Sequence, residues 1–163
     1  MDVKIKERPA FHIVGLSCDI VLKDARQTDT IPKLHEAFSK RVDEIRNRIN
    51  PNLSYGLFID PLNYNPDTDP FTWVAGVEVS DLEEIPEGMV GQTFNAPHFA
   101  VFSYKGKDKS SKPYDMLYKW VDQSADYQLA DRFGMEVYDE RYHGPLDPDS
   151  TFDLWFPVAK KQI

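Results

Sequence analysis

The residues best suited to hold a small molecule lie in two apolar segments near the C-terminus, at positions 134–142 and 152–158. Both segments predict β-strands, because β-branched and aromatic residues are dense in them and turn-forming residues separate them. Alternation along the first strand places Glu136 and Tyr138 on one face. In the second strand, Trp155 falls on the face opposite the apolar set. We therefore expect these three side chains to meet in a concave aromatic site.

Glu136 has the clearest chemical potential, because it stands between the apolar residues Met135 and Val137. A carboxylate that is walled by rings and shielded from water is costly to keep charged unless a cation pairs with it. A cationic aromatic ligand would remove that cost and would gain cation–π attraction from the rings. The alternative is an exposed glutamate that faces solvent. The same carboxyl could also act as an acid or a base on a strained ring, with Tyr138 orienting the reacting molecule.

Four further aromatic residues are predicted to line this site. They are Tyr55, Phe11, Tyr64 and Trp73. Trp73 has a second interpretation, because alternate positions of its strand are apolar and would place it in the core. A shift of one residue in the alternation would move every lining residue to the other face, so the choice of face stays open.

The sequence holds no pattern for a metal ion or a cofactor. The four histidines lack metal-ligand spacing. The loop at 63–69 alternates oxygen-bearing side chains as a calcium loop does, but Thr68 and Val74 stand where a glycine and a glutamate are required. No phosphate-binding loop or dinucleotide-binding glycine pattern occurs. The single cysteine, Cys18, excludes a disulfide framework within the chain.

Composition limits the class of protein. Of the 163 residues, 41% are hydrophobic, which is enough for one substantial domain with a real core. The formal net charge of -8 disfavours nucleic-acid binding, because neutralising phosphates needs a dense Lys and Arg surface. The N-terminus lacks an apolar signal core, and no stretch approaches the roughly 20 apolar residues of a membrane span. We expect a cytoplasmic protein with no nucleic-acid or membrane partner.

The apolar periodicity predicts an α+β fold with two main helices, at 30–49 and 111–131. An extended segment precedes each helix, and two strands follow it. The chain therefore reads as strand, helix, strand, strand, written twice. The acidic segment 81–88 is the predicted join within a single domain of residues 1–163, with pseudo-repeats at about 1–80 and 88–163.

Matching residues support a duplication. Pro9 and Phe11 recur as Pro97 and Phe99, 88 residues later in both cases. The apolar stripes of the two helices are offset by 83 residues, and the last strands by 81. The alternative is a chance similarity of two amphipathic units. Two such modules can bury their apolar faces together, which predicts pseudo-twofold symmetry, antiparallel sheets and a central cleft.

Five segments, in their order and spacing, resemble the GyrI-like small-molecule-binding domain, which is also the effector-binding domain of AraC-type and MerR-type multidrug regulators. They are residues 55–61, 71–76, 96–102, 135–138 and 154–158. The resemblance implies tandem strand-helix-strand-strand modules around a ligand cleft. It also implies that Glu136 is the ligand-polarising carboxylate, with Tyr138 and Trp155 as walls.

The function that this resemblance implies is the capture of lipophilic, aromatic or cationic compounds. Regulators of the family carry a helix-turn-helix domain ahead of this module, so the chain is interpreted as a stand-alone member. Two alternatives remain open. One is a hydrolase for strained electrophiles such as cyclopropanoids, with Glu136 and Tyr138 as catalytic residues. The other is an inhibitor or partner of a protein such as DNA gyrase.

Overall fold

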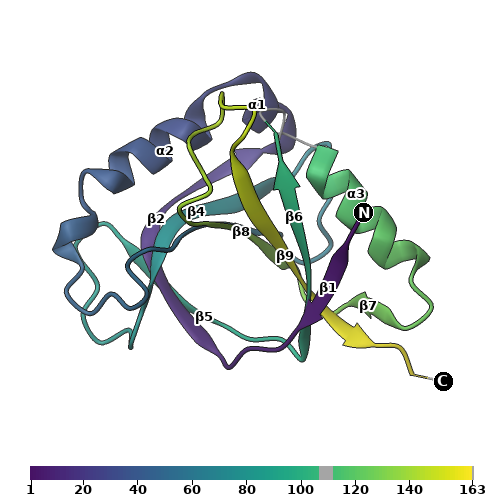
Figure 1. The fold of residues 1–163 in the computed structure, drawn as a ribbon. Helices are drawn as coiled ribbons and strands as arrows, with labels where there is room; N and C mark the ends of the chain where they lie inside the picture. Colours follow the sequence, from purple (N-terminus) through teal and green to yellow (C-terminus); the bar gives the residue numbers. More distant parts are fainter. Residues whose placement is uncertain (107–111, 163) are drawn as a thin grey trace. The chain divides into compact units, whose positions relative to one another are not determined.

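The computed structural model describes residues 1–106 and 112–162, which form two units (Figure 1). Unit 1 comprises Met1–Pro9 and Asn95–Ile163, and unit 2 comprises Ala10–Phe94. Each unit combines an antiparallel sheet with a main helix, which confirms the predicted α+β fold class. No helix in these described ranges is both long enough and apolar enough to cross a membrane.

Unit 2 contains four antiparallel strands in the order β3-β4-β2-β5. Its elements are β2 (Phe11–Val21), α1 (Leu22–Gln27), α2 (Thr30–Ser39), the 3-10 helix η1 (Val42–Glu44), β3 (Ser54–Ile59), β4 (Pro70–Val79) and β5 (Val90–Phe94). Figure 1 shows α2 alongside this sheet. One sheet face packs beneath α2, because the directly opposed residues Val14 and Val77 share a core with Phe38 of that helix.

The first helix is shorter than the sequence predicts. It was expected to continue to residue 49, but α2 ends at Ser39 and η1 follows. The Ser39 hydroxyl donates to the Glu36 carbonyl, and the Arg41 amide bonds three residues back, which tightens the last turn. Val42 and Ile45 still pack on the core beneath α2. The apolar spacing therefore reports burial correctly, although the backbone that delivers it is not a single helix.

Unit 1 contains strands in the order β1-β6-β9-β8, with β7 also paired to β9. Its elements are β1 (Val3–Lys6), β6 (His98–Lys105), α3 (Lys112–Gln123), β7 (Tyr127–Leu129), β8 (Phe133–Tyr138) and β9 (Thr151–Lys160). The pairing of β1 with β6 places residues 1–9 in the unit formed by the second half. In the same way, β5 belongs to the second predicted repeat but pairs with β2 in unit 2. These units are defined by contacts in the fold, and the single domain with pseudo-repeats at about 1–80 and 88–163 stays a prediction.

The second helix also ends early. The predicted helix spans 111–131, and its start at residue 111 lies outside the described residues. At its other end, the Ser124 hydroxyl accepts the amides of Asp126 and Tyr127. The chain turns there and forms β7, where the sequence predicts helix. The hydrogen bonds of the Ser124 side chain to the backbone replace those that a continued helix would make.

Candidate functional site

Glu136 lies on the sheet face of unit 1 that α3 covers. It is directly opposite Leu154 in β9, so its side chain shares a face with Leu154 and Phe156. Tyr118 of α3 packs on the Phe156 ring with centroids 4.5 Å apart, which places the helix over this face. The glutamate is only 4% exposed. A carboxylate in such a position needs hydrogen-bond partners to remain charged.

Two phenols supply partners to this carboxylate. The Tyr138 hydroxyl, from the same strand, donates to Glu136 Oε1 at 2.5 Å. The Tyr114 hydroxyl, from α3, donates to Glu136 Oε2. Hydrogen bonds to an ionised acceptor are roughly twice as strong as neutral ones. The two phenols therefore stabilise a carboxylate inside the unit and tie α3 to β8.

Burial fixes the protonation state of both phenols. It raises the pKa of Tyr114 and Tyr138 well above the ordinary value of 10.0, and the nearby charge and hydrogen bond of Glu136 raise each pKa further. Both hydroxyls are therefore protonated donors at neutral pH. In this arrangement they can solvate an anion or hand a proton to a bound molecule.

Aromatic rings surround the carboxylate and its donors. Tyr138 lies 4.6 Å from Tyr142 and 6.1 Å from Phe152, measured between ring centroids. Tyr114 lies 6.1 Å from Phe156. Ring faces carry negative electrostatic potential, so this aromatic shell favours a cation beside the carboxylate.

Trp155 is not part of this arrangement. It is directly opposite Met135 in β8, whereas Glu136 is opposite Leu154. Since neighbouring strand positions point to opposite faces, Trp155 lies on the face away from Glu136 and α3. The expectation that Trp155 meets Glu136 and Tyr138 is therefore wrong. Alternation within each strand was interpreted correctly, but the register that aligns the two strands was not available from either segment alone.

Three other predicted lining residues lie in the sheet of unit 2. The Tyr55 hydroxyl donates to Glu78 at 3.2 Å, and the Phe11 ring stacks on Phe94 at 5.7 Å. The Trp73 indole donates to Nε2 of His35 in α2 at 3.0 Å, so Trp73 packs under the helix of its unit. These contacts join elements within unit 2, and the ligand-binding roles of the three residues stay predictions.

Tyr64 lies in the loop between β3 and β4 and is half-buried. Burial raises the pKa of its phenol, and the charges of Asp60 and Asp69 add to the effect. This loop also contains the calcium-like spacing. Within the described ranges, no three His, Cys, Asp or Glu side chains gather in a way that could hold a metal ion.

Two residues of the candidate sites escaped the sequence interpretation. Tyr114 lies at helical spacing from the apolar residues Leu117 and Val121, and a phenol in such a stripe is a signal for a buried polar partner. Glu78 is a second buried carboxylate, 8% exposed, and receives hydrogen bonds from Tyr55 and Asn50. Its signal was an acidic residue between the apolar positions Val77 and Val79.

Residues 4–158 match the family model described as Cass2, integron-associated effector binding protein. The chain belongs to this family. The match confirms the GyrI-like resemblance and, with it, an effector-binding fold whose general role is small-molecule binding.

Three similar proteins illustrate the range of this fold. The transcriptional regulator BrlR of Pseudomonas aeruginosa is 35% identical over 161 residues, which are 97% of this chain and 56% of the regulator. The chain thus spans about half the length of that relative. A structure of SAV2435 bound to tetraphenylphosphonium has a TM-score of 0.72 at 14% identity and covers 98% of this chain and 94% of its own. The EcmrR C-terminal domain has a TM-score of 0.72 at 17% identity and covers 98% of both chains.

Proposed function

We propose that this protein binds lipophilic aromatic cations and that Glu136 is the carboxylate that receives them. One observation carries the proposal: a glutamate exposed to only 4% is held by two phenols inside an aromatic shell. A structural role alone does not require a carboxylate under a helix, because an apolar residue would pack there without a desolvation cost.

A delocalised cation suits this environment better than a compact one. Its charge is spread over a large apolar surface, so removing it from water costs less than removing an ammonium group. Beside Glu136 it would gain direct charge attraction and contact with the ring faces of Tyr138 and Phe156. The tetraphenylphosphonium bound to SAV2435, a protein of the same fold, is a ligand of this chemical class.

Thermal shift measurements test the proposal. Tetraphenylphosphonium should raise the melting temperature in a concentration-dependent manner, because a ligand that binds the native state stabilises it by mass action. Triphenylphosphine oxide, a neutral aromatic molecule of similar size, should raise it much less. Equal shifts with the two compounds would show that charge does not contribute, and would remove Glu136 from the account.

A second function is favoured by the pairing of Tyr138 with Glu136. The Tyr138 phenol, whose oxygen lies 2.5 Å from a Glu136 oxygen, can donate its proton to the carbon released as a strained ring opens, while the carboxylate takes a proton from the water that attacks the other carbon. The proton on Glu136 then returns to the Tyr138 oxygen through their hydrogen bond. The net reaction is addition of water across the broken bond. Incubation with a cyclopropane-bearing electrophile should yield the water adduct with the native chain and not with Glu136→Gln. Recovery of unchanged compound from the native chain would exclude this activity for that electrophile.

A further inference from the structure

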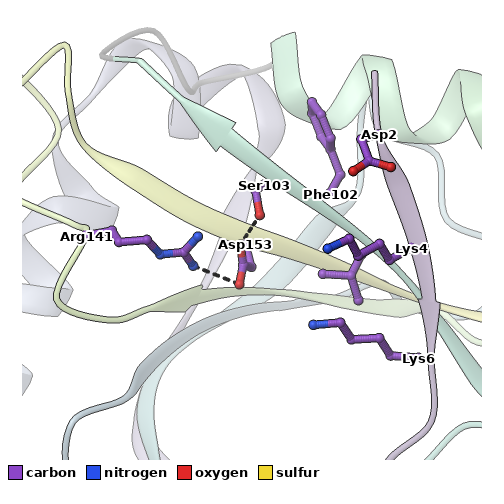
Figure 2. Close-up of a pocket in the computed structure, with 8 residues that line it drawn as sticks. Asp2, Lys4, Lys6, Phe102, Ser103, Arg141 and Asp153 are labelled. Atoms are coloured by element: carbon purple, nitrogen blue, oxygen red, sulfur yellow. Dashed lines mark hydrogen bonds and ion pairs between the residues drawn. The ribbon is translucent and has the colours of Figure 1, made fainter.

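A cavity of about 300 Å³ lies in unit 1 on the sheet face opposite Glu136 (Figure 2). Ser103 and Asp153, which are opposed in β6 and β9, both line it. Asp153 is also opposed to Val137, the neighbour of Glu136 in β8. Because neighbouring strand positions alternate between faces, this cavity and the Glu136 site are on opposite sides of one sheet. Its volume is at the lower end of the range for small-molecule sites.

The acidic side of this cavity is already satisfied. The Ser103 hydroxyl donates to Asp153 Oδ1 at 2.5 Å, and Arg141 Nη2 lies 2.9 Å from Asp153 Oδ2. Arg141 also donates to both oxygens of Asp139, and these bonds lower the pKa of that carboxyl. Both oxygens of Asp153 are therefore engaged, and the guanidinium is shared between two carboxylates.

The opposite side of the cavity carries Lys4 and Lys6 of β1. They are opposed to Val101 and Phe99 of β6, so both project from the face that bears Asp153. Figure 2 shows the two side chains extending from β1 toward Asp153 and Arg141. The Lys6 ammonium lies 5.5 Å from the centroid of the Trp155 ring, which helps to hold it in place.

The ammonium groups of Lys4 and Lys6 are the charges in this cavity that are available to bind a ligand. In the described part of the chain, neither lysine forms an ion pair, and the third basic group, Arg141, is committed to carboxylates. Asp2 adds one exposed carboxylate at the rim without an ion pair to either lysine among those residues. A hydrogen-bond acceptor placed between Lys4 and Lys6 would therefore meet two donors. The carboxylate of Asp153 would not repel it strongly, because Asp153 is already paired with Arg141.

We propose that this cavity binds a small oxyanion, the phosphate or carboxylate group of a small molecule, between Lys4 and Lys6. Charge-assisted hydrogen bonds from two ammonium groups would hold it. Lysines on an edge strand also discourage pairing with another chain. That role needs only exposed charge, and it explains neither the cavity nor the placement of Lys6 against Trp155. The inference is independent of the proposed function, because the two sites lie on opposite faces.

Titration of the complete chain with inorganic phosphate and, separately, with acetate tests the inference, with backbone amide shifts of Val101 and Ser103 as the readout. The double variant Lys4→Gln/Lys6→Gln removes the two donors. Lys33→Gln/Lys40→Gln is the matched control, because it makes the same change in net charge at two exposed lysines of unit 2. Lys4→Arg/Lys6→Arg keeps the charge and the donors.

Saturable shifts should occur with at least one probe in the native chain, the control and the arginine variant. Affinity should fall roughly tenfold or more in Lys4→Gln/Lys6→Gln. Tighter binding of phosphate than acetate would assign a phosphate ligand, and the reverse order a carboxylate ligand. Absence of saturable shifts with both probes would overturn the inference. So would an equal loss of affinity in the control, because net charge alone would then account for binding.

Discussion

Tyr114 is the residue whose removal reports most directly on the environment of Glu136. Replacing Tyr114 with Phe keeps the ring and removes one of the two hydroxyl donors, which leaves a buried carboxylate oxygen less satisfied. We expect a loss of about 1–3 kcal/mol in the free energy of unfolding, measured by urea denaturation. Tetraphenylphosphonium should then bind more tightly, because the carboxylate has lost a competing donor.

Tyr118→Phe is the matched control for this change. It removes a hydroxyl from the same helix, at a side chain that is 38% exposed, and keeps the ring that packs on Phe156. Its effect on unfolding should stay within about 0.5 kcal/mol. Equal effects of the two substitutions would contradict the special role of Tyr114.

Alkaline conditions should destabilise the protein through the same phenols. Their pKa values are raised above 10.0 in the folded state, so the folded state favours the neutral phenol. This stability is fully present below pH 10, where phenols of the unfolded chain are also protonated, and is lost as the pH rises from 10 through the folded pKa. The free energy of unfolding should therefore fall above pH 10. Tyr114→Phe/Tyr138→Phe should show a shallower fall, and an unchanged slope would contradict the assignment.

At the same scale, the sequence predicted part of the site. Alternation placed Glu136 and Tyr138 on one face, because both lie in one strand and need no tertiary information. Tyr114 could not be paired with them, since its contact depends on how α3 rotates over the sheet. Trp155 was misplaced because a one-residue change of register exchanges the faces of a strand.

The elements show the same division between local and tertiary information. Strands with alternating or continuous apolar character were predictable, whereas both helices ended earlier than their apolar periodicity indicated. In each case a short-range hydrogen bond, made by Ser39 or Ser124, accompanies the end of the helix, and after α2 the apolar residues Val42 and Ile45 remain packed. Periodicity detects the buried face, and caps and turns decide where the helix stops.

The pairing of β2 with β4 in unit 2 leaves no room for a side chain at Gly15. This residue is opposed to Gly76, and a Cβ atom built on it would lie 2.0 Å from the Ala75 carbonyl oxygen. The backbone of a neighbouring strand cannot move aside cheaply. Gly15→Ala should therefore lower the free energy of unfolding by about 3 kcal/mol or more. Ser17→Ala, at an exposed position of the same strand, should change it by less than about 0.5 kcal/mol. Similar denaturation midpoints for Gly15→Ala and Ser17→Ala would contradict the claim that the backbone packs too closely at Gly15 for a side chain.

Across the whole molecule, both units consist of an antiparallel sheet with a main helix, but the residues beneath the two helices differ in chemistry. Glu136 is opposed to Leu154 in unit 1, and the corresponding opposed pair beneath the helix of unit 2 is Phe58 and Trp73. Among the residues that the structure describes, a carboxylate at this position beneath a helix therefore occurs only in unit 1. We expect one tetraphenylphosphonium per chain by titration calorimetry, and two equivalent sites would show that the carboxylate is not what selects the ligand.

The measurement that tests the central claim most directly is the dissociation constant of tetraphenylphosphonium for three proteins: the native chain, Glu136→Gln and Glu140→Gln. The third makes the same charge change at an exposed residue four positions away. Titration calorimetry should show binding at least about tenfold weaker for Glu136→Gln, and within about twofold of native for Glu140→Gln. The same dissociation constant for all three proteins would contradict the claim that the buried carboxylate receives the ligand.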